Sequence, residues 1–484
     1  MNCKLGKGRI EDYSGDALIA FVYQNENRYK GALKGVIDNA VKSGRFSGEK
    51  NELFQVFPCG DIKSGRLIIV GLGKKSKADL DSFRKAAGVA IKAVRKLNKA
   101  AFAPIDNSRK TLAPIIEGAL LGSYRFDILK TTKKKLVLTE IAFFSDSTGI
   151  GQAHIDRVQA MTEGTLVARD FVNLPANILT PSKLAADAKR LGRKNGISVK
   201  ELSEAELKRL KMEALLSVGK GSENRPRMIV WEYNGGRKND KPIVFVGKGV
   251  TFDSGGLSLK QPQGMEAMKG DMGGAGAVIS LIPVLGKLKP KINVVGITPL
   301  VENMPSGMAY RPGDVLTASN GKTIEVISTD AEGRLILADA LVYAGRFKPK
   351  MVVDIATLTG ACMVALGVHI CAGVMGTDQQ LIDQLIKAGD QSGERLWQLP
   401  LWREYGEFLK TPAADIKNGG GRWGGAITAG WFLSNFAEGY KWAHVDIAGM
   451  DLEESGNHPY RYKGGTGWGV RLLARFILNK AGMK

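Results

Sequence analysis

Histidine and cysteine are scarce in this sequence, with four of each among 484 residues. No H-x-x-x-H, H-E-x-x-H or C-x-x-C pair occurs among His154, His369, His444, His458, Cys3, Cys59, Cys362 and Cys371. These spacings exclude the common zinc sites of histidine and cysteine, so any metal site must use mainly carboxylates. Cysteines this far apart predict free thiols in a reducing cytosol.

Long apolar runs are missing as well. No run approaches the ~20 apolar residues that cross a membrane. The first residues lead into the acidic Glu11 and Asp12 without the apolar segment and cleavage site of a secretory signal. We therefore expect a cytoplasmic protein with no membrane partner. Its length exceeds that of one ordinary core and predicts two domains.

Three catalytic or nucleotide-binding patterns are incomplete. Asp253-Ser254-Gly255-Gly256 resembles the nucleophile segment of serine proteases, but no histidine stands in a matching context. Gly274-Ala275-Gly276 lacks the third glycine of a dinucleotide fingerprint, since Ile279 stands in its place. Gly71-Leu72-Gly73-Lys74 lacks the spacing and the hydroxyl residue of a P-loop. These departures disfavour all three functions.

Negative charge is in short supply, and the formal net charge is +21. Residues 1–150 hold 27 Lys and Arg against 15 Asp and Glu, with basic clusters at Lys74–Lys77, Arg95–Lys96 and Lys133–Lys135. A basic surface of this kind can bind nucleic acid, and it can equally be a solvated face. Composition leaves both interpretations open.

Residues 1–150 alternate strand-like and helix-like runs and predict a compact α/β domain. Strands are expected at Asp16–Val22, at Arg66–Val70 and from Lys135 to Leu138, and helices at 79–98 and 112–123. The amphipathic pattern of residues 154–172, stopped by Asn173-Leu174-Pro175, predicts a connecting helix. We expect the domains to span residues 1–150 and 176–484, with a linker helix at 151–175.

A larger α/β region follows the linker. Its near-continuous Val and Ile runs are typical of strands covered by helices on both faces, and they lie at Ile243–Val246, Ile292–Ile297, Thr323–Ile327, Met351–Ile355 and His444–Ile447. Asn320-Gly321 predicts a tight hairpin before one of these strands, so part of the sheet is expected to be antiparallel.

The segment Ser328–Leu335 carries two carboxylates and a guanidinium between a strand-like and a helix-like run: Asp330, Glu332 and Arg334. Charged groups at such a turn, at the carboxyl end of a sheet, are typical of sites in α/β proteins. The alternative is that Asp330 or Glu332 merely caps the helix start and suits its dipole.

Two other clusters of charged residues also lie next to the end of a predicted strand or the start of a predicted helix. Gly247–Lys260 begins directly after a predicted strand and carries Lys248, Asp253 and Lys260, while Asp271 precedes a helix-like run and could simply cap it. If the clusters converge, four carboxylates repel one another unless positive charge lies between them. Two divalent cations about 3.5–4 Å apart would balance the charge of the four carboxylates. Oxygen ligands suit Mn²⁺, Mg²⁺ or Zn²⁺.

From about residue 165 to the C-terminus the chain resembles the leucyl aminopeptidase family, dimetallic cytosolic aminopeptidases. The matching segments are Asn173–Asn177, Gly247–Lys260, Lys269–Met272, Thr329–Leu335, Asp354–Ala361, Ala414–Asn418, Trp442–Gly449 and Gly465–Gly467. The resemblance implies a smaller, macro-domain-like N-terminal α/β domain joined by a helix to a larger catalytic α/β domain with a mixed sheet. Residues 1–150 match only in pattern and position.

The resemblance also implies roles for individual residues. One metal would be held by Lys248, Asp253, Asp271 and Glu332, and the tighter one by Asp253, Asp330 and Glu332, so that Asp253 and Glu332 bridge. Lys260 would stabilise the developing oxyanion, and Arg334 would hold a bicarbonate ion that relays a proton. The substrate cleft would be lined by Met268, Thr357, Leu358, Gly360 and Ala448.

The implied activity is removal of the N-terminal residue of a peptide, preferably Leu, Met or another apolar residue, by a hydroxide that bridges two metal ions. The ions would be Mn²⁺ or Zn²⁺, with Mg²⁺ as a further candidate. A homohexamer is implied, and some bacterial members also bind DNA. The chain departs from the family at Ser328, where Asn is usual; serine keeps a hydrogen-bonding group but is shorter. An inactive homologue is disfavoured, since every charged site position is kept.

Overall fold

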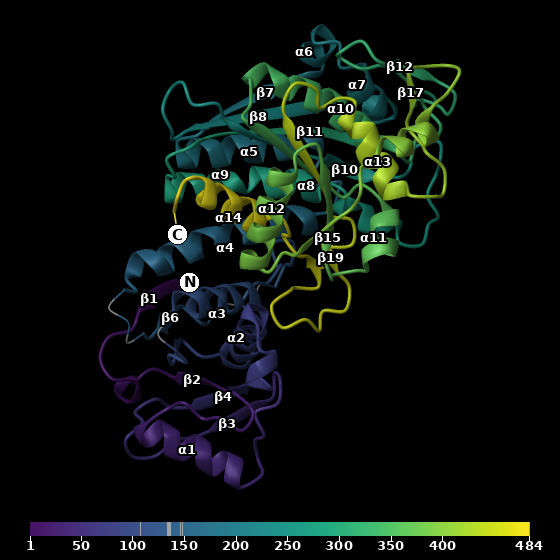
Figure 1. Ribbon diagram of the computed structural model, residues 1–484. Helices are drawn as coiled ribbons and strands as arrows, with labels where there is room; N and C mark the ends of the chain where they lie inside the picture. The colour runs from purple at the N-terminus through teal and green to yellow at the C-terminus, as the bar shows by residue number, and fades with distance from the viewer. Residues whose placement is uncertain (107, 133–136, 146, 148, 484) are drawn as a thin grey trace. The chain divides into compact units, whose positions relative to one another are not determined.

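The computed structural model describes residues 1–106, 108–132, 137–145, 147 and 149–483. The chain divides into two compact units, one formed by Met1–Thr162 with Ser455–Lys463 and the other by Glu163–Glu454 with Gly464–Lys484. Helix α4, Gln152–Asn173, runs from the first unit into the second (Figure 1). It corresponds to the helix that the sequence predicts over residues 154–172.

The first unit is built around a six-stranded sheet with the order β1-β6-β5-β2-β4-β3, in which only the β3–β4 pair is antiparallel. Its elements are β1 (Asn2–Leu5), β2 (Ala17–Val22), α1 (Gly31–Lys42), β3 (Leu53–Val56), β4 (Leu67–Gly71), α2 (Leu80–Val94), β5 (Lys99–Phe102), α3 (Arg109–Gly122) and β6 (Glu140–Phe143).

The alternation of side chains along β2 places helices on both faces of this sheet. Leu18 and Ala20 belong to one apolar cluster with Leu33 of α1. Ile19 and Phe21 point the other way, into a cluster with residues of α2 and α3. The unit is therefore the small α/β domain that the sequence predicts.

One predicted strand of this unit is displaced. Residues 133–136, which include the start of the strand expected from Lys135 and the lysine cluster, lie outside the described residues. Val137 and Leu138 are not in a strand, and the strand of this region, β6, begins at Glu140.

The second unit contains a nine-stranded mixed sheet with the order β16-β15-β18-β14-β9-β11-β8-β7, to which β10 adds beside β11. The central strands β18, β14, β9, β11 and β10 are parallel, and β7, β8 and β15 introduce antiparallel pairs. The strands are β7 (Ser198–Leu202), β8 (Arg227–Asn234), β9 (Ile243–Gly247), β10 (Gly249–Asp253), β11 (Asn293–Asn303), β14 (Met351–Ala356), β15 (Ala372–Gly376), β16 (Leu396–Gln398) and β18 (Lys441–Asp446).

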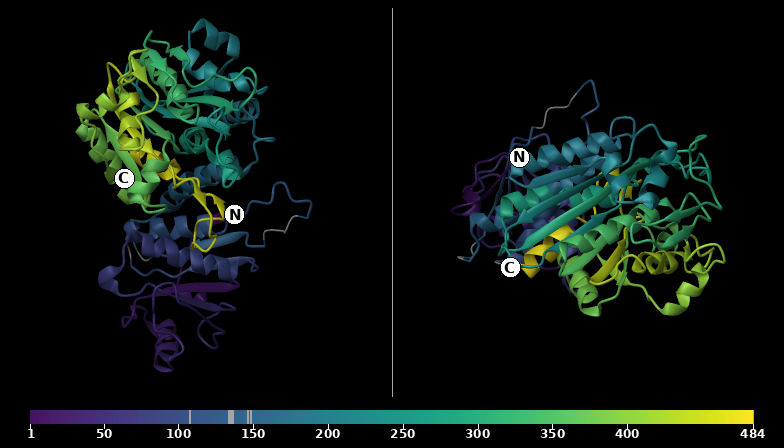
Figure 2. Two further views of the ribbon diagram at one scale, coloured as in Figure 1. Left: turned by 90° about the vertical axis from the view of Figure 1, so that its right-hand side faces the viewer. Right: turned by 90° about the horizontal axis from the view of Figure 1, so that it is seen from above.

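Helices lie on both sides of this sheet (Figures 1 and 2). They are α5 (Pro181–Asn195), α6 (Glu204–Arg209), α7 (Glu213–Val218), α8 (Gly273–Ile279), α9 (Leu281–Leu288), α10 (Glu332–Ala344), α11 (Gly360–Leu366), α12 (Gln379–Ser392), α13 (Gly425–Ser434) and α14 (Val470–Lys480). On β9, Val244 and Val246 join the apolar cluster of α10, whereas Phe245 contacts Phe476 of α14 edge to face. The sheet is covered on both faces, as the Val and Ile runs predict.

The predicted strand Thr323–Ile327 does not belong to this sheet. Its first part is β13 (Thr323–Glu325), which lies in a separate three-stranded sheet with β12 (Val315–Thr317) and β17 (Ile416–Lys417). Only Ile324 is buried in β13, and its two neighbours are half-buried, which is the alternation of a strand with one covered face. The predicted hairpin is present, because β12 and β13 are antiparallel across Asn320-Gly321.

One stretch of the described residues, Met265–Leu288, has the length and hydropathy of a membrane-crossing helix. It comprises the 3-10 helix η4 (Met265–Gly270), α8 and α9, and 78% of its most apolar window is buried inside the protein. Helices in the core of a protein have this composition too.

Close packing of α8 against β14 leaves no room for a side chain at Gly274. A Cβ at this position would lie 2.1 Å from the carbonyl oxygen of Ile355, a backbone atom held in the sheet. We expect Gly274→Ala to lower the free energy of unfolding by about 1–3 kcal/mol or more, measured by urea denaturation. Gly307→Ala is the matched control, since a Cβ there meets open space, and its effect should stay within about 0.5 kcal/mol. Equal effects of the two changes would contradict this account.

Candidate metal centre

Charged side chains gather where the parallel strands of the second unit end. Lys248 directly follows β9, Asp253 is the last residue of β10, and Thr357 follows β14. Asp330 and Glu332 stand at the start of α10, and Asp271 lies between η4 and α8. This is the edge at which α/β sheets commonly bind ligands.

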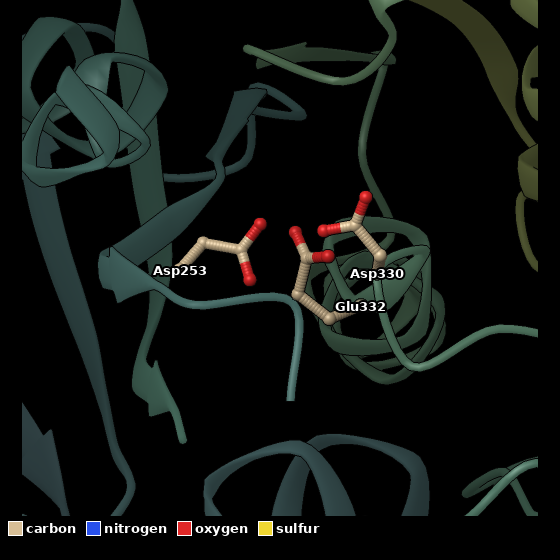
Figure 3. Close-up of side chains that lie close together, drawn as sticks. All are labelled: Asp253, Asp330 and Glu332. Carbon is tan, nitrogen blue, oxygen red and sulfur yellow. The ribbon is translucent and has the colours of Figure 1, made fainter. Parts of the chain in front are cut away.

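Three carboxylates form the centre of this cluster. Oxygens of Asp253, Asp330 and Glu332 lie within 4.8 Å of one another. Figure 3 shows the three carboxylates pointing toward a common point, Asp253 from one side and Asp330 and Glu332 from the other. Asp253 and Glu332 are buried, whereas Asp330 is exposed, so the cluster opens to solvent on the Asp330 side.

Two lysines lie among the carboxylates. Lys248 Nζ is 2.8 Å from both Asp271 Oδ1 and Glu332 Oε1, and it donates to the Thr357 carbonyl at 2.8 Å. Lys260 Nζ is 2.9 Å from Asp253 Oδ2 and also pairs with Asp330. Four carboxylates thus face two ammonium groups, which leaves negative charge in excess.

The pKa values reflect this crowding. Burial, followed by the charge of Glu332, raises the pKa of Asp253 to about 6, and burial raises that of Asp271 well above its usual value. Burial alone would lower the pKa of Lys248, but the charges of Asp271, Glu332 and Asp253 outweigh it and raise that pKa. Among its protein neighbours alone, Lys248 is therefore held in its charged form. Divalent cations bound beside Lys248 would lower its pKa instead.

Two buried oxygens show that a cation fits here. Asp271 Oδ2 and Glu332 Oε2 have no hydrogen-bond partner among the described residues. A buried carboxylate oxygen without a partner is costly, and coordination to a divalent ion removes that cost. The donor set consists of carboxylate oxygens and one amine, which suits Mn²⁺, Mg²⁺ or Zn²⁺ rather than a thiolate-bound metal.

Helix capping does not explain these carboxylates. The N-cap of α8 is Met272 and that of α10 is Ala331, and neither cap receives a side-chain hydrogen bond. Asp271 instead pairs with Lys248 and accepts a hydrogen bond from Thr357 Oγ1 at 2.7 Å. None of these carboxylates is therefore an N-cap, although Glu332 does lie in the first turn of α10, where a negative charge suits the helix dipole.

Arg334 lies apart from the ion pairs. It is buried on α10, its Nη1 donates to the Asn418 carbonyl at 2.7 Å, and its Nε has no hydrogen-bond partner among the described residues. Among the described residues, no carboxylate oxygen lies within 4.0 Å of the Arg334 guanidinium. Burial lowers its pKa to about 10, so the group stays charged at neutral pH. A buried cation with a spare donor fits a small anion.

Two asparagines that sequence reasoning did not single out support the carboxylates. Asn303, at the end of β11, donates through Nδ2 to Asp253 Oδ1 at 2.8 Å and to the Thr329 carbonyl at 2.9 Å. Asn418 accepts from Ile327 N at 2.7 Å and donates to the Ser328 carbonyl at 2.8 Å. Asn418 stands in one of the motifs that carry the family resemblance, which is the only signal that could have pointed to it.

Ser328, where the chain departs from the family, takes part in the same turn. Its Oγ accepts a hydrogen bond from the backbone N–H of Asp330 at 3.2 Å. Its backbone N–H and carbonyl both bond to the Asn418 side chain, at 3.3 and 2.8 Å. The shorter side chain therefore still supports the turn that carries Asp330.

The predicted substrate-lining residues come from three elements near the cluster. Thr357 and Leu358 lie in the loop after β14 and Gly360 is the first residue of α11, while Ala448 follows β18 and Met268 lies in η4. The buried carboxylate of Asp446, which sequence reasoning also missed, joins two of these segments. It accepts from Leu358 N at 3.1 Å, from Thr359 Oγ1 at 2.7 Å and from Ala448 N at 3.2 Å.

Comparison with known proteins agrees with this site. Residues 166–474 match the model of the cytosol aminopeptidase family catalytic domain, and residues 20–133 match that of its N-terminal domain. A probable cytosol aminopeptidase of Geotalea uraniireducens (strain Rf4) is 45% identical over 456 residues, which cover 92% of each chain. One of Geobacter sp. (strain M21) is 42% identical over 493 residues, covering 99% of this chain and 100% of the relative.

One solved structure has the same fold over nearly the whole chain. The bottromycin maturation enzyme BotP, in complex with Mn, superposes with a TM-score of 0.87 at 34% sequence identity, and the match covers 96% of this chain and 100% of BotP. The sequence and fold matches extend over both units, and the carboxylate cluster lies in the part that matches the catalytic domain. The chain therefore belongs to the cytosol aminopeptidase family, and its activity is that of a metal-dependent aminopeptidase.

Proposed function

We propose that this protein is a leucyl aminopeptidase that uses two metal ions to remove the N-terminal residue of peptides, preferably Leu, Met or another apolar residue. The observation that carries the proposal is the group of four carboxylates and two lysines, in which the buried oxygens Asp271 Oδ2 and Glu332 Oε2 have no partner among the described residues.

Five side chains would hold the metal ions. Lys248, Asp253, Asp271 and Glu332 would hold one ion and Asp253, Asp330 and Glu332 the other, with Asp253 and Glu332 shared. When bound, the two ions supply a hydroxide nucleophile at neutral pH and polarise the scissile carbonyl group. Mn²⁺, Zn²⁺ and Mg²⁺ all suit these donors, and the Mn in the BotP complex favours manganese.

Lys260 and Arg334 would act on the reacting groups. Lys260 is held by Asp253 and Asp330 at the open side of the cluster, where it can donate to the carbonyl oxygen as negative charge develops on it. Arg334 would bind bicarbonate through its spare donors, and the bound anion would accept and pass on the proton of the nucleophile.

The lining residues would position the peptide. Thr357, Leu358 and Gly360 would border the bound peptide beside Asp271, to which Thr357 donates a hydrogen bond, and the apolar side chains of Met268 and Ala448 would contact the first side chain of the substrate. Because a thioether adapts to several shapes, we expect a broad tolerance of apolar residues rather than strict selection.

The family resemblance and the names of the relatives also suggest a cellular location and an oligomeric state. We propose a cytoplasmic homohexamer, whose mass light scattering can check. Large apolar side chains exposed on the second unit are consistent with subunit contacts; they include Val364, Ile370, Trp402 and Trp423.

Hydrolysis of leucine p-nitroanilide tests the proposed function. We expect the purified protein to release p-nitroaniline with Mn²⁺ present, to lose more than about 99% of this activity after chelation, and to regain it when Mn²⁺ or Zn²⁺ is restored, because the metal supplies the nucleophile. N-acetyl-leucine p-nitroanilide is the substrate control, since it lacks the free amine that would bind a metal. Full activity after thorough removal of metal, or equal cleavage of both substrates, would refute the two-metal aminopeptidase.

The contacts of Asn418 generate a second prediction. Asn418→Ala removes the partners of Ile327 N–H and the Ser328 carbonyl and should loosen the turn that carries Asp330. We expect Mn²⁺ affinity, measured by calorimetric titration of the metal-free protein, to fall by about 10–100-fold. Asn435→Ala is the control, because Asn435 makes a similar bond, to the Trp431 carbonyl at 2.8 Å, at the end of α13. An unchanged affinity in Asn418→Ala would show that the turn needs no such support.

Binding of DNA is a second candidate function. It rests on the basic excess of residues 1–150, in which Lys74, Lys75 and Lys77 are exposed. Gel-shift titrations should show affinity falling more than about tenfold between 50 and 200 mM salt, and Lys74→Gln with Lys77→Gln should make that dependence shallower. The paired change of Lys238 and Lys291 to Gln, exposed in the other unit, is the control. An affinity for DNA that does not change with salt concentration would exclude binding through the DNA phosphates.

A further inference from the structure

Asp451 is an acidic residue that lies beside the predicted substrate-lining residues. It follows the segment after β18 that carries Ala448. Asp451 Oδ2 lies 3.0 Å from the position that a Cβ would take on Gly270, and Asp451 Cβ lies 3.3 Å from the corresponding position on Gly273. That position on Gly273 is 3.7 Å from Thr357 Cγ2. Asp451 thus lies next to the end of η4, close to the loop of Thr357.

Asp451 is closely surrounded by protein. Burial raises its pKa to about 7, although part of its surface stays open to solvent. Glycine at 270 and 273 leaves room for its side chain, because a Cβ at either position would lie 3.0 or 3.3 Å from an atom of Asp451.

The carboxylate of Asp451 has no basic partner. No lysine, arginine or histidine among the described residues lies within 4.0 Å of it, and the hydrogen bonds that lower its pKa come from the backbone N–H groups of Asp451 itself and of Leu452. A carboxylate has about four acceptor sites, so these two bonds leave capacity for a ligand. Lys248, the nearest lysine to act on its charge, is already committed to Asp271 and Glu332.

The neighbouring groups fit one kind of side chain. Met268 and Ala448 are apolar and lie two residues before Gly270 and three before Asp451 in the sequence, and a cation beside Asp451 would favour the charged form of its carboxylate. Lysine and arginine side chains have this composition, an aliphatic stem with a cationic head, and they bury the stem while the head finds a polar partner. Leucine is too short to place any group against the carboxylate.

We propose that Asp451 determines specificity by pairing with the cationic side chain of an N-terminal arginine or lysine, so that the protein cleaves basic as well as apolar N-terminal residues. The inference rests on the proposed function, because it assigns the first side chain of the peptide to the space beside Met268, Thr357 and Ala448. Arginine is the better match, since its planar guanidinium can bond to both carboxylate oxygens.

The test compares arginine with citrulline, its neutral isostere, and with leucine, as amides of 7-amino-4-methylcoumarin with Mn²⁺ present. We expect kcat/KM of the unaltered protein to be at least about tenfold higher for arginine than for citrulline. In Asp451→Asn that preference should fall by about tenfold or more, while kcat/KM for leucine stays within about twofold. The asparagine keeps an oxygen for the N–H group of Leu452, so the loop is retained.

Glu266→Gln is the matched control, because it removes the same charge from an exposed position on η4 and should leave the arginine preference unchanged. An Asp451 that only shapes its loop would lower the rates for all three substrates together, and this result would overturn the proposal. So would leucine cleavage with no preference for arginine over citrulline in the unaltered protein. Failure to cleave leucine at all would instead refute the proposed function, which keeps the two conclusions separate.

Discussion

Repulsion among four carboxylates is the constraint on which the catalytic unit depends. Asp253, Asp271, Asp330 and Glu332 are brought together with only two lysines to offset their charge. Left unbalanced, such a group favours protonation or local opening, because each buried anion raises the pKa of its neighbours. The second unit tolerates the arrangement because strand and helix ends hold the carboxylates in place, and because the excess negative charge suits bound divalent cations.

Close approach of helix α10 and hydrogen bonds from two asparagine side chains hold these groups in place. Gly333 allows α10 to approach Lys248 so closely that a Cβ there would lie 2.6 Å from Lys248 Cε. Asn303 ties the end of β11 to Asp253, and Asn418 ties β17 to the turn of Asp330. Because each carboxylate is anchored separately, loss of one anchor should misplace one ligand rather than unfold the unit.

The location of the site could be predicted from sequence because it depends on local order. A charged residue at or directly after the end of a buried parallel strand must lie at the carboxyl edge of the sheet, and Lys248 directly follows β9 while Asp253 ends β10. Asn303 and Asn418 could not be found in this way, since their partners lie 50 and 91 residues away along the chain. The strand expected at Thr323–Ile327 was assigned to the wrong sheet for a related reason: an apolar run shows that a strand is buried, but not which strand it pairs with.

Chemistry and selectivity are carried by different elements of the same sheet. The predicted metal ligands come from β10, the start of α10 and the turn before it, and the ends of β9 and η4, whereas the predicted substrate-lining residues after β14 and β18 lie on other segments. Asp446 joins the segments after β14 and β18 through bonds to Leu358, Thr359 and Ala448, and none of these bonds involves a predicted metal ligand. Residues further along the β18 segment can therefore change without disturbing the carboxylate cluster. Asp451 stands at such a position, which is where a chain with a conserved reaction can acquire its own choice of substrate.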